Sequence, residues 1–421
     1  MTTATLWRHR DFRKLWAADA ASVLGSQIAE LALPLTAITV LGASPLLVGL
    51  LAATQYAPFL LIGLPAGAWV DRLPRRPVMI VADLVRAAVL LAVPVSALCG
   101  VLRLWVLYPA ALVVGGMTVF FDLAAQSFLP TVIEEERLVE GNSKLQISTT
   151  IGQLGGASIG GLLVQWLTAP VAVLANSVGF GVSGVLVLLV QAQEELRPPE
   201  AERAALVTEI KDGLRSVFGH RLLRPIVLTA GLGNLFGLFG MGQAVLLLYA
   251  VRQLHLSAAA LGGVLAVANG GVLVGSLLNE RLTGLRGVGP ALGGSAVLMA
   301  SALLLLPLAT PTSAVPVLVA AMALAGFSAA VFNINSVSLR QSVTPPELRG
   351  RMTATFRFVN WGAIPLGTFA GGALVGPLGL RTVVWLLGLG SLLAALPVLG
   401  PAVRSLREIP GHTPQKEIAH A

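Results

Sequence analysis

The sequence predicts an all-α integral membrane protein, with twelve transmembrane helices in two six-helix, pseudo-symmetric bundles. Of its 421 residues, 55% are hydrophobic and only 11% are charged, whereas a soluble domain carries about 25% charged residues. The chain therefore lacks the charge to cover a water-facing surface of its size. Only helices and closed barrels satisfy their backbone hydrogen bonds in a bilayer. Because the apolar runs are of helix length and rich in Leu, Ala, Val and Gly, helices are expected.

Twelve apolar runs are long enough to cross a bilayer, which takes about 20 residues for each helix. Glycines and prolines inside them are compatible with membrane helices, because neighbouring groups satisfy the freed backbone. The predicted spans are residues 15–41, 46–70, 77–98, 104–128, 145–168, 170–191, 225–250, 258–279, 288–308, 314–339, 355–376 and 382–403.

The basic residues predict the orientation. Of the 28 lysines and arginines, three (Arg103, Arg252 and Arg381) fall in loops on one side and Arg86 falls within a span. The rest lie on the side that carries both termini. Since cytoplasmic loops carry an excess of Lys and Arg, we expect a multi-pass protein of the inner (plasma) membrane with both termini cytoplasmic. The same loops account for the net charge of +8, so no nucleic-acid partner is expected.

A long polar connection divides the chain into two halves. Within it, Leu206, Ile210, Leu214 and Val217 recur at helical spacing, which predicts an amphipathic helix on the cytoplasmic membrane surface. A Gly-Gly-x-Leu-Val string closes a glycine-rich span in each half, as internal repetition requires. The expected domains are an N-terminal bundle (1–191), a linker (192–224) and a C-terminal bundle with a cytoplasmic tail (225–421).

Several chemistries are not expected. Cys99 is the only cysteine, which excludes disulfides within the chain and thiolate metal sites. The five histidines fall in predicted loops or tails and suggest no metal cluster. The sequence has no G-x-x-x-x-G-K-[ST] phosphate loop and no plausible catalytic set. We therefore expect neither an enzyme nor a cofactor.

Four side chains within predicted spans are candidates for function. An ionised acid near the middle of a span costs a few kcal/mol, so Glu30 should face a cavity or a partner, or be protonated. We interpret it as a candidate proton-binding carboxylate; the alternative is a structural acid with a fixed hydrogen bond. Gln27 lies on nearly the same helix face and is expected to bind substrate or to stabilise packing. The i, i+3 spacing of Asp83 and Arg86 predicts an ion pair, with a gating role as the alternative.

Uncharged polar residues in the spans suggest a polar route. Each is expected either to contact substrate or to join helices, a contribution of about 1–2 kcal/mol at most. These candidates for the substrate cavity are Gln146, Gln153, Asn176, Asn234, Gln243, Asn269, Asn333, Asn335 and Asn360. Arg340 and Arg357 lie near the cytoplasmic ends of their spans, where Arg side chains reach back to water; anion binding is the alternative.

The loop after the second span reads Gly67-Ala-Trp-Val-Asp71-Arg72-Leu-Pro-Arg75-Arg76. It resembles the motif G-x-x-x-D-R-x-x-R-R between the second and third helices of major facilitator superfamily transporters. The resemblance implies a cytoplasmic gate: Gly67 lets helices approach, Asp71 caps a helix of the other half, and Arg72, Arg75 and Arg76 reach Asp122 near the end of the fourth span.

The fifth span carries Gly152-x-x-x-Gly156-Ala157-x-x-Gly160-Gly161. This string resembles the motif G-x-x-x-G-P-x-x-G-G of drug/proton antiporters, with Ala157 in place of the proline. The alternative is ordinary glycine packing between helices. The strings at residues 11–16 and 344–351 resemble those of the macrolide- and siderophore-efflux branch.

The resemblance implies a secondary transporter that works by alternating access, with a substrate site between the halves. The implied activity is proton-coupled efflux of a small amphipathic organic molecule, such as an antibiotic, a drug, a siderophore or another secondary metabolite. The expected partners are this substrate, protons and the lipid bilayer, and the protein is expected to be a monomer. One alternative is a proton-symport or facilitative importer of a small metabolite. Another is a membrane sensor or lipid scramblase, which would show no saturable solute flux.

Overall fold

The computed structural model describes residues 6–70, 73–134, 137–192, 194, 206–345 and 348–408, and these residues contain helices but no strand. The first half contains η1 (Leu6–Arg8), α1 (Arg10–Leu35), η2 (Thr36–Val40), α2 (Pro45–Leu61), α3 (Gly63–Val70), α4 (Arg75–Leu98), α5 (Leu104–Val132), α6 (Leu138–Trp166) and α7 (Ala169–Leu188). The second contains α8 (Leu206–Gly219), α9 (Leu223–Phe236), α10 (Met241–Leu248), η4 (Tyr249–Gln253), α11 (Ala258–Arg286), α12 (Val288–Leu305), η5 (Leu306–Leu308), α13 (Ala314–Val343), α14 (Arg349–Leu378), α15 (Leu380–Ala395), η7 (Leu396–Leu399) and α16 (Pro401–Arg404).

The predicted twelve-span, all-helical fold is confirmed. Ten helical segments of the described chain are long and apolar enough to cross a membrane. The second span is a shorter apolar helix, α2, which α3 extends after a break at Ile62. The twelfth segment is α6, a 29-residue helix that carries more polar residues than the others. The observed boundaries lie within a few residues of most predicted ones.

Two spans are interrupted, which the sequence analysis did not predict. The seventh span breaks between α9 and α10 over residues 237–240, and it resumes at Met241. The break packs so tightly that a Cβ atom on Gly240 would lie 2.0 Å from the carbonyl oxygen of Asn234. Only glycine fits at such a position. Broken membrane helices persist where they line a cavity or are buried in protein, and α10 does line a cavity.

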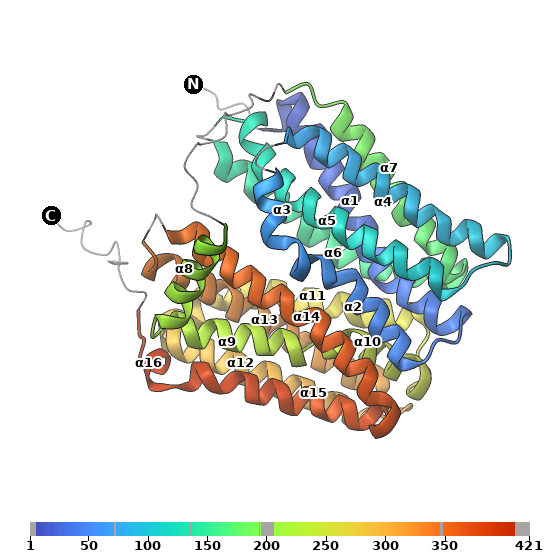
Figure 1. The fold of residues 1–421 in the computed structure, drawn as a ribbon. Coiled ribbons are helices and arrows are strands. Elements are labelled where there is room, and N and C mark those ends of the chain that lie inside the picture. The colour runs from blue at the N-terminus through green and yellow to red at the C-terminus, as the bar shows by residue number, and fades with distance from the viewer. Residues whose placement is uncertain are drawn as a thin grey trace.

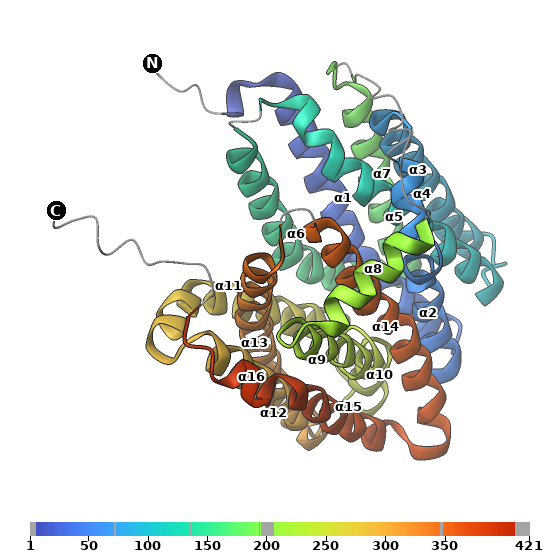
Figure 2. The ribbon, with the colours of Figure 1, turned by 60° about the vertical axis from the view of Figure 1, so that its left-hand side comes forward.

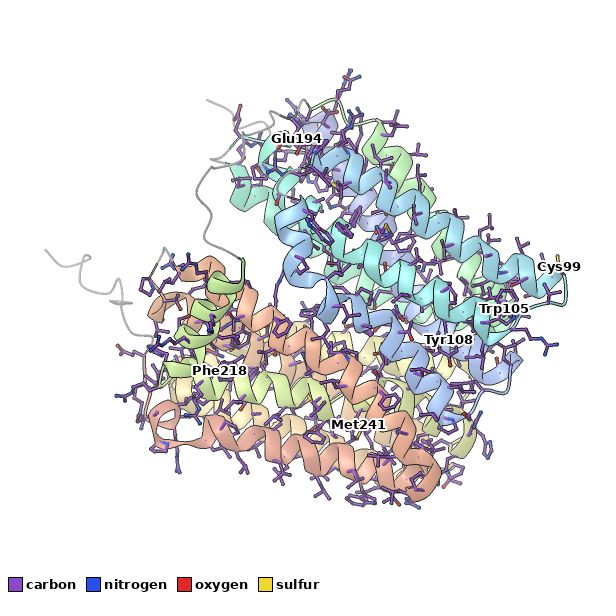
Figure 3. The ribbon with its side chains drawn as sticks, viewed as in Figure 1. Cys99, Trp105, Tyr108, Glu194, Phe218 and Met241 are labelled. Atoms are coloured by element: carbon purple, nitrogen blue, oxygen red, sulfur yellow. The ribbon has the colours of Figure 1, made fainter. Side chains whose placement is uncertain are left out.

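The two halves lie side by side and diverge toward one end of the molecule (Figure 1). Across their interface α2 packs against α14, and α6 packs against α11. A Cβ atom on Gly49 of α2 would lie 2.8 Å from the Cα atom of Gly372 of α14, so the helices touch backbone to backbone. The described ends of the chain, η1 and α16, lie at the same end of the molecule (Figure 1), which we call the terminal end. Cys99 lies at the opposite end (Figure 3).

The linker helix α8 packs against α9 and α14 of the second half (Figure 2), and its expected place on the membrane surface stays a prediction. Val217 is fully buried in that contact. A Cβ atom on Gly213 would lie 2.5 Å from the hydroxyl oxygen of Thr355. The side chains of Leu206 and Ile210 lie outside the described residues. The apolar face of α8 is therefore used at least in part to cover the second bundle.

Candidate functional site

Glu30 lies at the centre of a hydrogen-bonded cluster that joins the two halves. Gln27, one turn earlier on α1, donates from Nε2 to Oε2 of Glu30 at 3.2 Å. Gln243 of α10, in the other half, donates from Nε2 to Oε1 of Glu30 at 3.4 Å. The same Gln243 nitrogen lies 3.2 Å from the hydroxyl oxygen of Tyr56 on α2, and that hydroxyl is in turn a hydrogen-bond neighbour of Glu30. We call these four residues the Glu30 cluster.

Local sequence explains why the backbone is irregular beside Glu30. Pro34 lies four residues later on α1 and has no N–H group, so it cannot donate the helical hydrogen bond to the carbonyl of Glu30. The next turn, Thr36–Val40, is a π-helix, a distortion that is common at functional sites. The other side of the cluster is also irregular, because Gln243 lies in the first turn of α10, which begins after the helix break at 237–240.

Three residues of the Glu30 cluster, Gln27, Glu30 and Gln243, form part of the wall of a cavity of about 350 Å³. Its other lining residues are mostly Leu, Val, Phe and Met side chains from α10, α11 and α13. Among the lining residues that the structure describes, Glu30 is the only charged one, and Gln27, Gln243 and Asn269 supply amides. We call this space the inner cavity. Apolar walls with a few converging polar groups are typical of a site for a small organic molecule.

A second cavity, of about 500 Å³, opens between the halves toward the terminal end. Asp122 of α5 lines it from the first half, and Arg349 and Arg357 of α14 line it from the second. Phe59 and Trp361 are also part of its wall. We call this space the terminal cavity. A carboxylate of the first half and two guanidinium groups of the second half therefore line the same space. The two halves pack together farther from the terminal end (Figure 1).

Two arginines of the loop motif, Arg75 and Arg76, have partners other than the one expected. Arg75 donates from its backbone N–H to Glu194, at 2.9 and 2.7 Å from the two carboxylate oxygens, and from its guanidinium at 3.1 Å. Glu194 therefore caps the N-terminus of α4, where the helix dipole favours an anion. Figure 3 labels Glu194 at the terminal end of the molecule.

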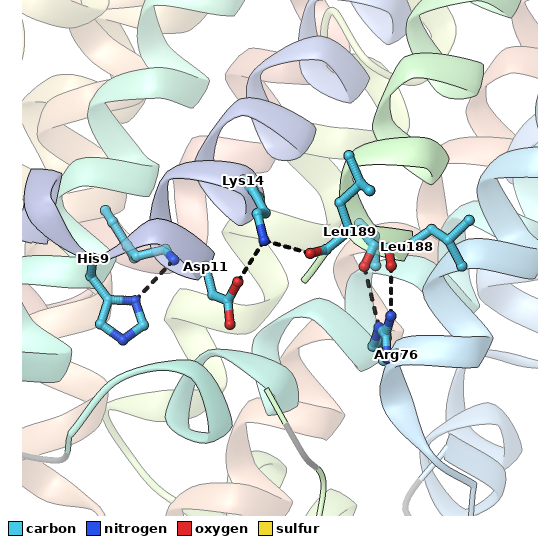
Figure 4. Close-up of polar contacts among 8 residues, drawn as sticks. His9, Asp11, Lys14, Arg76, Leu188 and Leu189 are labelled. Atoms are coloured by element: carbon cyan, nitrogen blue, oxygen red, sulfur yellow. Dashed lines mark hydrogen bonds and ion pairs between the residues drawn. The ribbon is translucent and has the colours of Figure 1, made fainter. Parts of the chain in front are cut away.

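Arg76 contacts the C-terminus of α7. Its guanidinium donates to the carbonyls of Val187 at 3.3 Å and Leu188 at 2.6 Å. Lys14 of α1 reaches the next carbonyl, that of Leu189, and also pairs with Asp11 at 2.9 Å (Figure 4). Two cations thus satisfy carbonyls that a helix leaves unpaired at its C-terminus.

Arg75 and Arg76 therefore take part in a clasp within the first half, and the contact expected between them and Asp122 is not among their described hydrogen bonds and ion pairs. Arg357 lies across the terminal cavity from Asp122, and Arg86 of the first half is also close enough to act on its charge. Asp71 and Arg72, the other charged residues of the motif, lie outside the described residues. Gly67 lies within α3, near its C-terminal end.

Asp83 and Arg86 form a buried ion pair on α4, with 0% and 1% of their side chains exposed. Arg86 also donates to the hydroxyl of Thr118 at 3.3 Å. Its guanidinium lies over the rings of Phe121 at 4.5 Å and Phe180 at 4.1 Å. The pair thus ties α4 to α5 and α7 inside the first bundle and lines neither cavity.

The glycine stripe of α6 lets that helix approach two neighbours. A Cβ atom on Gly156 would lie 2.6 Å from the Cβ atom of Gln27, and Gly152 and Gly160 also face α1. A Cβ atom on Gly161 would instead lie 2.4 Å from the carbonyl oxygen of Ala258, on α11 of the other half. The stripe therefore positions α1 beside the Glu30 cluster and brings α6 against the second half.

The remaining polar candidates divide between the cavity and helix packing. Asn269 lines the inner cavity. Asn234 donates to the backbone carbonyl of Asn360 at 3.1 Å, and Asn335 donates to Asn279 at 2.6 Å, so both join helices. Of the four others, Asn176 is buried and Asn333 is exposed, and the side chains of Gln146 and Gln153 lie outside the described residues.

Sequence reasoning missed Tyr56 and Glu194. Tyr56 is one of only three tyrosines and lies in an otherwise apolar span. A tyrosine at such a position indicates a buried hydroxyl group that needs a hydrogen-bond partner. Glu194 follows the last turn of α7 and carried no such signal, because its partners are more than 100 residues away in the sequence.

Comparisons with known proteins find similarity to membrane transporters. The family model described as "Transmembrane secretion effector" matches residues 1–415. The chain is 28% identical over 373 residues to the multidrug efflux pump Tap of Mycolicibacterium fortuitum, covering 84% of this chain and 86% of that protein. It is 20% identical over 406 residues to macrolide efflux protein A of Streptococcus pyogenes, covering 94% and 97%. The crystal structure of the nucleoside transporter NupG matches with a TM-score of 0.75 at 13% identity, covering 92% of this chain and 98% of that one, and so shows the shared fold.

Proposed function

The chain belongs to the transmembrane secretion effector family of major facilitator superfamily transporters, and from this premise we propose that it is a proton-coupled exporter of a small amphipathic organic molecule. The proposed orientation places the terminal end, and with it both termini, in the cytoplasm. The two bundles that flank the linker 192–224 are the bodies that move in alternating access. The efflux pumps among its relatives support export as the direction.

The observation that carries this proposal is the Glu30 cluster. A carboxylate in an apolar cavity is a functional group by default, because burying a charge in a membrane protein is costly. This one is hydrogen bonded to Gln243 of the other half, so a change in its charge alters a contact between the two moving bodies. That link is what a coupling residue requires, since an ion can shift a conformational equilibrium only through differential interactions with the two states.

Gln243 can serve both protonation states of Glu30. When Glu30 is ionised, it accepts hydrogen bonds only, and Nε2 of Gln243 supplies a donor. When Glu30 is protonated, its O–H needs an acceptor. The Oε1 atom of Gln243 is buried and has no hydrogen-bond partner among the described residues, so rotation of the amide by half a turn offers it to Glu30. The cluster can thus exchange one hydrogen-bond pattern for another as a proton binds.

The terminal cavity supplies the second element, a gate. Asp122 and Arg357 face each other from the two halves, and closure of the cavity would bring these opposite charges together. We assign this role to the pair, with Gly67, Asp71, Arg72, Arg75 and Arg76 holding the neighbouring loop. The glycines at 152, 156, 160 and 161 keep α6 close to α1 and α11, as the antiporter-like motif implies.

The energetics suit export. One proton that enters down a 100 mV potential supplies about 2.3 kcal/mol. Since about 1.4 kcal/mol corresponds to a factor of ten, that sustains a gradient of roughly tens of fold for each proton, before any contribution from a pH difference.

The proposal is tested with Glu30→Gln in proteoliposomes and everted vesicles, with a radiolabelled macrolide and a fluorescent lipophilic dye as probes. The matched control is Glu134→Gln, which neutralises an exposed loop acid of the same half. We expect Glu30→Gln to abolish uptake driven by a pH gradient into everted vesicles while the protein still reaches the membrane, and Glu134→Gln to behave as the wild type.

Gradient-driven transport at the wild-type rate by Glu30→Gln would remove Glu30 from the coupling role. Movement of probe out of everted vesicles, rather than into them, would identify an importer. Absence of saturable flux for the wild-type protein with every probe would favour a sensor or scramblase.

A further inference from the structure

We propose that Tyr56, Phe59 and Trp361 form an aromatic barrier between the terminal cavity and the inner cavity, and that Trp361 is the side chain that opens it. The proposal deepens the transport function, because it names a residue that controls passage of the solute. Only the role in solute passage rests on the proposed function. The barrier itself is defined by the three rings and the two cavities that they separate.

The three rings pack as one group. Phe59 and Trp361 are stacked, with ring centroids 4.8 Å apart and an interplanar angle of 20°. Tyr56 lies beside both, at 6.3 Å from Phe59 and 6.4 Å from Trp361. All three separations fall in the range in which aromatic rings attract one another. We call this group the aromatic barrier.

The barrier has a different cavity on each side. Phe59 and Trp361 are part of the wall of the terminal cavity. Tyr56 lies one turn farther from the terminal end on α2, and its hydroxyl contacts Gln243, which lines the inner cavity. A solute that passes from the arginine-lined cavity to the Glu30 cluster therefore meets these rings.

The barrier is built from both halves of the protein. Tyr56 and Phe59 belong to α2, and Trp361 belongs to α14. These two helices form a main part of the contact between the halves, and their approach is close at this level, where a Cβ atom on Gly362 would lie 2.8 Å from Cδ1 of Leu60. Because the rings sit at this crossing, relative motion of the halves must change how they stack.

Trp361 is the ring that is free to move. Tyr56 is held by its hydrogen bond to Gln243. Trp361 is 40% exposed, and the terminal cavity of about 500 Å³ on its open side leaves room for another rotamer. Its backbone is fixed, because the preceding residue, Asn360, accepts a hydrogen bond from Asn234 just before the break in the seventh span. A fixed backbone with a mobile ring is the arrangement that a gate requires.

The single cysteine of the chain makes a direct test practical. In a Cys99→Ala background, Ala268→Cys places a thiol in the wall of the inner cavity, and Thr353→Cys places one in the terminal cavity. A charged, membrane-impermeant maleimide is added to everted vesicles without substrate or gradient. Rapid labelling of Thr353→Cys verifies that the reagent reaches the terminal cavity.

We expect Ala268→Cys to react slowly, and Trp361→Ala to accelerate its labelling by about tenfold, the factor expected when aromatic contacts are removed. The matched control is Phe358→Ala, which removes a ring from the same cavity but not from the barrier, and it should leave the rate unchanged. Phe59→Ala should reproduce the acceleration from the other half, which guards against misfolding of a single variant. Neither ring variant should alter the labelling of Thr353→Cys.

The proposal is overturned if Ala268→Cys reacts as fast as Thr353→Cys while Trp361 is intact, or if neither Trp361→Ala nor Phe59→Ala accelerates it. Because the assay measures access and not transport, failure of Glu30→Gln to block export would leave this result untouched. Conversely, an absent barrier would not contradict proton-coupled export.

Discussion

Gln243 of α10 donates a hydrogen bond to Glu30 of α1 at 3.4 Å, and this bond crosses from one half of the protein to the other. Both residues lie beside an interruption of regular helix, Pro34 on one side and the break at 237–240 on the other. The bond therefore links the candidate proton site to the other half of the protein, whose motion the proposed mechanism couples to proton binding.

Removing that bond should uncouple the halves. Gln243→Leu keeps a side chain of similar size but loses the amide, and a hydrogen bond to a charged group contributes about 1.5–3 kcal/mol. We expect gradient-driven transport in proteoliposomes to fall by about tenfold or more. The control Gln253→Leu alters an exposed residue of η4 and should leave the rate unchanged. Wild-type transport by Gln243→Leu would contradict a coupling role for the bond.

Two neighbouring glycines of α6 should respond differently to the same change. A Cβ atom on Gly156 would lie 2.6 Å from the Cβ atom of Gln27, whereas one on Gly155 would meet its nearest atom at 3.9 Å, an ordinary contact. We expect Gly156→Ala to displace Gln27 and to lower the transport rate several-fold, and Gly155→Ala to have no effect. Equal activity of the two variants at equal membrane levels would show that the close contact is not required.

The buried pair of α4 should behave non-additively. Asp83→Leu or Arg86→Leu alone leaves an unpaired buried charge, which costs about 3–5 kcal/mol. The double variant leaves none, so it should melt at a higher temperature than either single variant in detergent. Thermal unfolding of the three purified proteins measures this. A double variant whose loss equals the sum of the single losses would argue against direct coupling of the two side chains.

The cap on α4 should contribute to stability in a graded way. Glu194→Gln keeps an acceptor for the backbone N–H groups of Arg75 and Arg76 but loses the charge, and Glu194→Ala loses both. Since loss of a helix cap costs about 1 kcal/mol, we expect Glu194→Ala to lower the melting temperature by about 2 °C and Glu194→Gln to lower it less. Glu280→Ala, at an exposed position of α11, serves as the control. No change in Glu194→Ala would exclude the cap as a stabilising contact.

The features predicted from the sequence are those set by local geometry. Spans follow from the length of apolar runs, and the contact between Asp83 and Arg86 follows from their separation by one helical turn. The same spacing placed Gln27 on nearly the same helix face as Glu30; the hydrogen bond between the two side chains is a finding of the structure.

The features that were missed depend on how distant segments meet. The contact of Tyr56 with Gln243 requires that α2 and α10 belong to different halves that approach each other, and nothing in either segment specifies the other. The family resemblance assigned the loop arginines to Asp122, yet Arg75 pairs with the carboxylate of Glu194 and Arg76 with carbonyls at the end of α7. Charge alone does not choose among partners when several acceptors lie within reach of a long side chain.

The clasp at the terminal end is complete within the first half of the chain. Every residue that closes it, from Lys14 and Arg76 to the α7 carbonyls and Glu194, lies in the first 194 positions. Since chains are made from the N-terminus and domains fold as units while synthesis continues, the first six-helix bundle can close its own terminal end before the second bundle has been synthesised. The second bundle then folds against a first bundle whose terminal end is already closed.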